Sequence, residues 1–213
     1  MMGFSERIGT WKKAMLSPVP TFSEEAAKTE RGFRDGFENY GTPIILVYLP
    51  LTIIGMIMLG QLNFMLPIAA ILGIGMMAFF ILIATLIYTA ILYVVSMLMG
   101  GKAPFGKLYY MISLPFAPLY TISGLVALLV MIINVLLGKM LGGALSLASS
   151  LLSLVLALYG LYLLTLSLDA LYKYGKLKAV VAWLVPTTVM LGIALLIFGV
   201  TLLAMTGLMA KGY

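Results

Sequence analysis

Five long apolar runs dominate the pattern of polar and apolar positions along this chain. They extend from Ile44 to Gly60, Phe64 to Met99, Leu119 to Leu137, Leu145 to Leu168 and Val180 to Met209. Apolar runs of about 17 to 25 residues are typical of membrane-spanning helices, because a helix pairs its backbone N–H and C=O groups within itself where no water is present. The pattern predicts an all-α polytopic transmembrane bundle with five spans.

The second run, of 36 residues, raises the question of one span or two, and the basic residues favour one. With one span and a cytoplasmic N-terminus, eleven of the 13 basic residues lie on the cytoplasmic side: Arg7, Lys12, Lys13, Lys28, Arg31, Arg34, Lys102, Lys107, Lys173, Lys176 and Lys178. If the second run formed two spans, eight basic residues would lie on one side of the membrane and five on the other, which is a weaker bias under the positive-inside rule. We therefore expect a multi-pass cell-membrane protein with its C-terminus outside. Phe64 to Leu72 is expected as a tilted lead-in, with Gly73 and Gly75 as a junction.

Before the first run lies a polar segment of 42 residues, which we call the arm, and the chain is expected to divide into the arm (1–42) and a five-span domain (43–213). Apolar residues recur in the arm at helical spacing, namely Phe4, Ile8, Trp11 and Met15. The sequence from Ser17 to Pro20 should end this helix. A second helix is expected from Thr21, carrying Phe22, Ala26, Phe33 and Phe37 along one side. Amphipathic helices of this kind either lie on the bilayer or dock a partner.

A polar stretch, "GGKAPFGKLYYMISLPFAPLY", interrupts the apolar pattern between the second and third runs. Its two basic residues, Lys102 and Lys107, belong to the inner loop of the five-span arrangement. Pro115 and Pro118 disfavour an uninterrupted helix, because proline lacks an N–H donor. The pattern predicts a short surface helix from Phe105 to Leu114 that bends into the third span.

Small residues at three- and four-residue spacing predict where two spans pack together. Ser146, Ser150, Ser153 and Gly160 form such a stripe on the fourth span, and Gly192 and Gly199 form one on the fifth. Small side chains let two helices approach closely within a membrane. We expect these two stripes to face each other.

Few polar side chains within the spans offer chemistry. The second span carries a hydroxyl stripe of Thr85, Thr89, Tyr93 and Ser96, which either lines a polar path or bonds to its own helix. Asp169 is the only acid after Glu38, and Lys173 follows it at i+4. The pair is either an interfacial ion pair or the polar centre of a transporter.

Composition narrows the classes of function further. The chain is 63% hydrophobic and 9% charged, and it contains no Cys and no His. Thiol nucleophiles, imidazole bases and Cys/His metal sites are therefore excluded, and the 16 methionines are scattered rather than grouped with other ligands. No cofactor or metal is expected. The net charge of +6 indicates that the basic residues contact anionic lipid headgroups on the cytoplasmic side rather than nucleic acid.

Three segments together resemble the Yip (Ypt-interacting protein) domain family of five-span membrane proteins. They are "SPVPTF" from Ser17, "GGKAPFGKLYYMISLPFAPLY" from Gly100 and "LYGLYLLTLSLDALYKYGKLKAVVAWLVP" from Leu158. The resemblance implies a cytoplasmic N-terminal region and five packed helices. Eukaryotic members act in vesicle trafficking, membrane organisation and association with Rab-type GTPases. Many eukaryotic members have a longer N-terminal region than this arm, and in this respect the chain resembles a compact prokaryotic member.

These observations predict a non-enzymatic protein that organises membrane or docks partners through its cytoplasmic side. The residues expected to face partners or lipid are Trp11, Lys12, Lys13, Phe22, Lys102, Lys107 and Lys176. A membrane-protein partner or a homo-oligomer is expected. The alternative is a small transporter or channel that uses the hydroxyls of the second span and Asp169.

Overall fold

The chain folds into helices in every part that its computed structural model describes, namely residues 2–58, 65–137 and 142–210. Two short helices come first, α1 (Phe4–Leu16) and α2 (Pro18–Ala27). The remaining elements are α3 (Phe33–Pro43), a π-helix (Ile44–Tyr48), α4 (Leu49–Met58), α5 (Met65–Leu98), α6 (Phe105–Leu137), α7 (Gly142–Tyr172) and α8 (Lys176–Ala210).

Five of these helical segments are long and apolar enough to cross a membrane, which confirms the predicted architecture. They are Phe33–Gly55, Ala78–Leu98, Phe105–Asn134, Leu145–Tyr172 and Lys176–Thr201. The second run is one helix through Gly73 and Gly75, and Phe64 lies outside the described residues. Mean hydropathy over the whole chain is +1.15, as expected for such a protein.

The first span begins at Phe33, eleven positions before the predicted start at Ile44. The helix continues from α3 into α4 through the π-helix, so the expected boundary between residues 42 and 43 falls inside one helical segment. Pro43 and Pro50 flank the π-turn, and neither can donate a backbone hydrogen bond. A wider turn there adjusts the helix to the missing donors.

The arm forms two helices, as predicted, but the second one, α2, starts three residues earlier than expected and is shorter. Pro18 occupies the first turn of α2, where a missing N–H costs nothing. The helix ends at Ala27, so Phe33 and Phe37 belong to α3 and do not share a side with Phe22. The Thr21 hydroxyl donates to the carbonyl of Ser17 at 2.8 Å instead of capping the helix.

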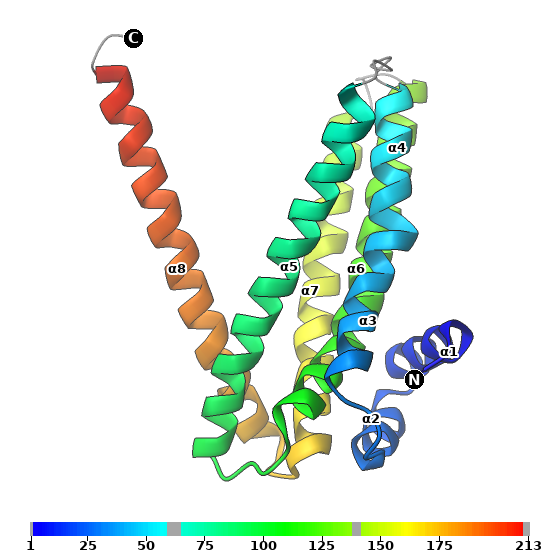
Figure 1. Cartoon of the computed structure of the whole chain (residues 1–213), viewed down its shortest axis with the longest axis vertical. Helices are drawn as coiled ribbons and strands as arrows, with labels where there is room; N and C mark the ends of the chain where they lie inside the picture. The colour runs from blue at the N-terminus through cyan, green and yellow to red at the C-terminus, as the bar shows by residue number, and fades with distance from the viewer. Residues whose placement is uncertain (1, 59–64, 138–141, 211–213) are drawn as a thin grey trace.

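The helices α3 to α7 lie side by side, and α8 diverges from them away from its first turns (Figure 1). The helices α1 and α2 pack beside one end of this bundle, together with the loops 99–104 and 173–175. We call this end the arm end. All basic residues of the described part of the chain lie there; the two others, Lys139 and Lys211, are outside it.

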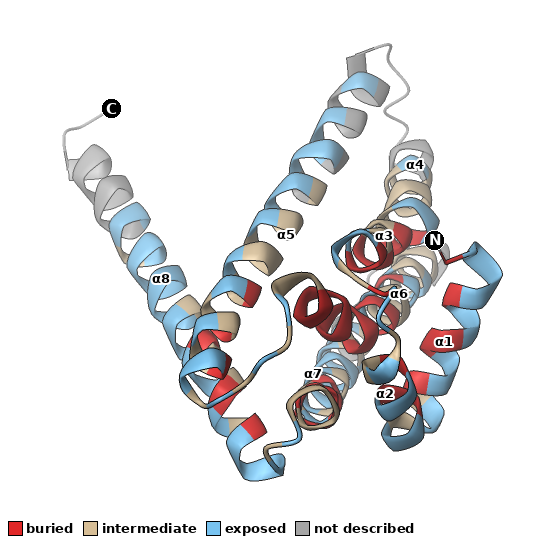
Figure 2. Cartoon of the chain, turned by 60° about the horizontal axis from the view of Figure 1, so that its bottom comes forward, coloured by how far each residue is buried: buried red, intermediate tan, exposed pale blue. Residues whose placement is uncertain are grey.

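The core lies at the arm end, and α6 is at its centre (Figure 2). One side of α6 packs Tyr110, Met111 and Leu114 against Trp11 and Phe22 of the arm. The other side packs Leu108 and Ile112 against buried residues of α5, α7 and α8. These residues are Leu92, Leu164, Leu168, Ala179 and Ala182. The segment predicted as a surface helix, Phe105 to Leu114, is thus the most buried part of a span.

A side chain of the neighbouring helix α7 explains why α6 is not interrupted at Pro115. Pro115 cannot donate to the carbonyl of Met111, four residues earlier. The hydroxyl of Ser167 on α7 donates to that carbonyl at 2.8 Å. A side chain of a neighbouring helix therefore satisfies the freed acceptor, and α6 continues through the proline.

Candidate functional site: the junction between arm and bundle

The buried side of α1 is not the one that the apolar spacing predicted. Trp11 is 4% exposed and packs in the core, together with Arg7, Thr10 and Ala14 of the same helix. Phe4 is 56% exposed. Trp11 and the fully buried Phe22, both expected to face partners or lipid, instead attach the arm to the bundle.

A chain of hydrogen bonds accompanies this apolar packing and links three helices. The indole Nε1 of Trp11 donates to Asn39 Oδ1 at 3.2 Å, and Asn39 Nδ2 donates to Ser113 Oγ at 2.8 Å. Asn39 is fully buried. Because a buried amide without partners is costly, this chain fixes how α1, α3 and α6 meet.

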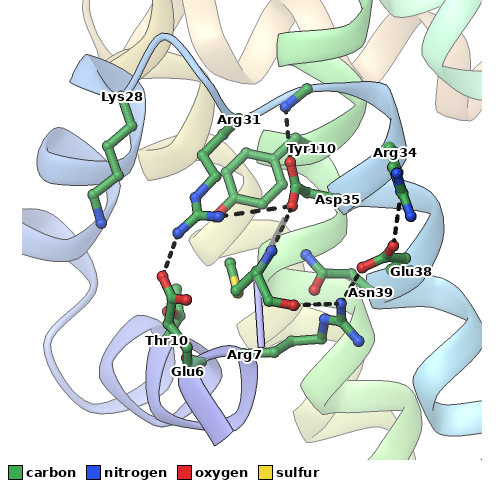
Figure 3. Close-up of polar contacts among 12 residues, drawn as sticks. Glu6, Arg7, Thr10, Lys28, Arg31, Arg34, Asp35, Glu38, Asn39 and Tyr110 are labelled. Carbon is green, nitrogen blue, oxygen red and sulfur yellow. Dashed lines mark hydrogen bonds and ion pairs between the residues drawn. The ribbon is translucent and has the colours of Figure 1, made fainter. Parts of the chain in front are cut away.

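The charged residues of the arm form a network of ion pairs. Figure 3 shows the Arg31 guanidinium between Glu6 and Asp35, with an Arg31 Nη1 to Asp35 Oδ1 distance of 3.7 Å. Arg31 is 8% exposed. A second pair joins Arg7 to Glu38, and Arg7 Nη1 donates to Thr42 Oγ1 at 3.0 Å. These contacts join α1 to the loop after α2 and to α3.

Glu25 is the most deeply buried acid of this network, at 3% exposure. Its Oε1 lies 2.6 Å from Lys28 Nζ, and its Oε2 accepts a hydrogen bond from the Tyr110 hydroxyl at 2.6 Å. The hydrogen bond with Glu25 raises the pKa of Lys28 above its usual value, although partial burial opposes this. Glu25 therefore holds a cation of the arm and a tyrosine of α6 at once.

Lys107 is buried at the first turn of α6 instead of facing a partner or lipid as expected. Its Nζ donates to the carbonyl of Glu25 at 2.6 Å and to the carbonyl of Lys28. It also lies 5.7 Å from the centre of the Tyr110 ring. Four other basic residues of the predicted surface, Lys12, Lys13, Lys102 and Lys176, are exposed.

Glycines on α3 and α6 lie at close contacts between helices, and they do not belong to the small-residue stripes predicted from the sequence. A Cβ on Gly36 would lie 2.7 Å from the Tyr109 ring and 3.0 Å from the Tyr110 backbone. A Cβ on Gly124 would lie 2.5 Å from Val47 Cγ1. Of the predicted stripes, Gly160 lies against Leu119 of α6.

The structure does not bring the two predicted stripes of the fourth and fifth spans together. Ser146, Ser150 and Ser153 are exposed, and the last two hydroxyls donate to carbonyls of their own helix. A Cβ on Gly192 or Gly199 would meet nothing within 4 Å. The divergence of α8 in Figure 1 explains this separation.

The residues considered for transport have local partners. Asp169 Oδ1 accepts a hydrogen bond from the backbone N–H of Gly175 at 2.9 Å, and it forms no ion pair with Lys173, both residues being described. Thr85 and Thr89 donate to carbonyls of α5 itself. The Tyr93 ring packs edge-on against Phe105, and Ser96 is buried.

Comparison with known proteins assigns the chain to a protein family. The sequence model of the Yip1 domain matches residues 12–199, which includes α2 to α7, the last turn of α1 and most of α8. No curated protein and no solved structure matches the chain. Within the described residues, no group of three or more Asp or Glu side chains is arranged to hold a metal ion. This multi-pass membrane protein belongs to the Yip1 domain family.

Proposed function

We propose that this protein is a non-enzymatic scaffold that docks protein partners, and thereby organises membrane, through the arm end. The arm end is the cytoplasmic side in this proposal, because the basic residues of the described chain lie there and basic loops remain on the cytoplasmic side. Membership of the Yip1 domain family supports protein partners as the class of ligand.

One observation carries the proposal: the arm is fixed to the bundle, yet its outer side carries large exposed apolar side chains. Leu16 and Val19, at the turn between α1 and α2, are 72% and 57% exposed, and Phe4 is 56% exposed. The exposed Lys12 and Lys13 lie on the same segment. Large apolar side chains held rigidly beside basic groups are typical of interaction surfaces.

Transport, the alternative predicted from the sequence, has weaker support. It requires Asp169 and the hydroxyls of α5 to serve a passing solute. Asp169 instead accepts from the Gly175 backbone, and the hydroxyls of Thr85 and Thr89 donate to their own helix. We therefore keep docking as the proposal.

Site-specific photo-crosslinking in native membranes tests docking. A photoreactive residue at position 16 or 19 should give a discrete protein adduct, whereas the same residue at position 196 on α8 should not. Leu196 is the matched control, because it is a leucine with 68% exposure and follows the start of α8 at Lys176 by 20 residues. Adducts to lipid alone from positions 16 and 19 would contradict docking. Deleting the arm is unsuitable as a test, because it would expose the core that Trp11 and Phe22 fill.

A further inference from the structure

A cavity of about 740 Å³ opens at the arm end, between the arm and the start of α6. Its wall consists of the loop after α2, the loop 100–104, the first turn of α6 and the end of α7. Four basic residues line it, Lys28, Arg31, Lys102 and Lys107, and none of the described lining residues is acidic. The cavity is therefore built for negative charge.

The charges of Lys28 and Arg31 are already balanced within the protein. Lys28 Nζ lies 2.6 Å from Glu25 Oε1 and 3.1 Å from Glu24 Oε1. The Arg31 guanidinium pairs with Glu6 and Asp35. These two residues shape the wall, and Lys102 and Lys107 are the two lining cations that form no salt bridge with a described residue.

Lys107 is a buried cation that forms no salt bridge with any residue the structure describes, and the carboxylates of Glu25 and Glu30 act on its charge only from beyond ion-pair distance. The residue is only 7% exposed, and its Nζ donates to two backbone carbonyls, those of Glu25 and Lys28. Carbonyl oxygens accept hydrogen bonds but do not neutralise a charge. An ammonium has three N–H donors, so one remains. Buried charges are normally paired, because desolvation is otherwise too costly.

The start of α6 and Lys102 supply the other features of an anion site. The N–H of Lys107 already donates to the carbonyl of Pro104 at 3.0 Å. The N–H groups of Phe105 and Gly106 are therefore the first donors of α6 without an acceptor within the helix, and the helix dipole adds positive potential there. Pro104 precedes α6 and has no side-chain oxygen that could cap these groups. Lys102 is exposed on the adjoining loop and forms no ion pair with any described residue.

We propose that this cavity binds a phosphomonoester, with Lys107 and Lys102 as its counter-ions and the first N–H groups of α6 as hydrogen-bond donors. A phosphomonoester carries a charge of about −1.5 to −2 at pH 7, which matches two ammonium groups, and its oxygens accept several hydrogen bonds. The phosphate can belong to a lipid headgroup or to a soluble compound. The site lies inside the arm end rather than on the outer side of α1 and does not depend on the proposed docking.

Two titrations of the full chain in nanodiscs test the site and distinguish the two sources. In phosphatidylcholine nanodiscs, glycerol 3-phosphate is added and followed by phosphorus NMR. In a second set, phosphatidic acid is included in the bilayer and its own phosphorus signal is followed. Saturable binding is expected in one set or in both, and the set in which it occurs identifies the source.

Matched lysine substitutions make the test specific to the cavity. Lys102→Ala and Lys107→Met should each weaken binding at least tenfold. Lys176→Ala should leave it unchanged, because Lys176 is an exposed lysine at the same end that does not line the cavity. Lys107→Met removes a buried group and can prevent folding. If the Lys107→Met protein does not fold, Lys102→Ala alone is compared with Lys176→Ala.

Three results would overturn the proposal. The first is the absence of saturable binding in both sets of nanodiscs. The second is an equal loss of affinity in Lys102→Ala and Lys176→Ala, which would indicate general attraction of anions to a basic surface. The third is undiminished binding by a folded Lys107→Met protein.

Discussion

The hydroxyl of Tyr110 donates a hydrogen bond of 2.6 Å to the carboxylate of Glu25, a residue 85 positions earlier in the chain. The same carboxylate holds Lys28 at 2.6 Å. Glu25 belongs to α2 and Tyr110 to α6, so one buried acid joins the arm to the centre of the bundle. The arm cannot separate from the bundle without leaving these groups unpaired.

Replacing this acid should therefore destabilise the protein far more than replacing its neighbour. Glu25→Gln removes the charged acceptor of the Tyr110 hydroxyl and leaves Lys28 paired only with the exposed Glu24, which should lower the free energy of unfolding by about 1–3 kcal/mol. Glu24→Gln is the control, because the Glu24 side chain is 61% exposed and its replacement should change stability much less. Denaturant unfolding in mixed micelles measures both. Equal effects would mean that the burial of Glu25 is irrelevant to stability.

The contact between α3 and α6 predicts opposite effects for two glycines one and a half turns apart. Gly36→Ala places a Cβ 2.7 Å from Tyr109 and should cost about 1–3 kcal/mol through overpacking. A Cβ on Gly41 meets nothing within 4 Å, and alanine is the better helix former by about 0.5–1 kcal/mol. Gly41→Ala should thus raise the unfolding temperature, whereas Gly36→Ala should lower it. Stabilisation by both would show that the two helices are not in close contact.

Trp11 and Asn39 should be energetically coupled, since the indole of one donates to the amide oxygen of the other. Trp11→Phe removes the donor, and Asn39→Ala removes the acceptor together with the bond to Ser113. In a double-mutant cycle, residues in one hydrogen-bond network usually show a coupling of about 0.5–3 kcal/mol. Unfolding of the two single variants and the double variant measures the coupling. Strictly additive effects would contradict the contact.

The salt bridge between Lys28 and Glu24 has a defined pH range. The hydrogen bond and charge of Lys28 lower the pKa of Glu24 below its usual 4.5. A carboxyl whose pKa is lowered by folding stabilises the folded state above its unfolded pKa, and this contribution is lost as pH falls through the lowered value. Carboxyl NMR titration should show a higher Glu24 pKa in Lys28→Met than in the unchanged protein. An identical pKa in both would exclude the salt bridge in solution.

The five spans could be predicted because lipid imposes one simple requirement on the backbone. A span must be long, apolar and helical whatever surrounds it, so run length identifies it. The direction in which the arm helices face obeys no such requirement. The spacing of Phe4, Ile8 and Trp11 grouped them on one side, but Trp11 turns into the core because Asn39 and the apolar side chains of α6 and α7 receive it.

The buried character of residues 108–114 was missed for a related reason. Pro115 normally indicates a helix break, and Lys102 and Lys107 indicated a surface loop. The hydroxyl of Ser167, 56 positions away from Met111, donates to the Met111 carbonyl that Pro115 leaves without a donor. The Lys107 ammonium donates to backbone carbonyls of the arm. Both partners are set by tertiary packing, which local spacing does not reveal.

Asp169 provides the last prediction, because docking and transport assign it different roles. Its Oδ1 accepts the N–H of Gly175 and so closes the loop 173–175, where Lys173 and Gly175 have φ values of +54° and +88°. Asn retains an acceptor at this position and Ala does not. If the role is structural, Asp169→Ala should lower the free energy of unfolding by about 1 kcal/mol and Asp169→Asn by less.

Lys173→Gly is the supporting variant, because glycine adopts a positive φ without the strain of about 1–2 kcal/mol that other residues incur. It should stabilise the loop that Asp169→Ala weakens, and unfolding in mixed micelles measures both. A transporter would behave differently, since replacing the acid of its predicted solute path by Asn would abolish solute flux into liposomes while leaving the fold intact. Loss of flux in Asp169→Asn at unchanged stability would favour transport over docking; unchanged crosslinking of the arm in that variant is the result that docking requires.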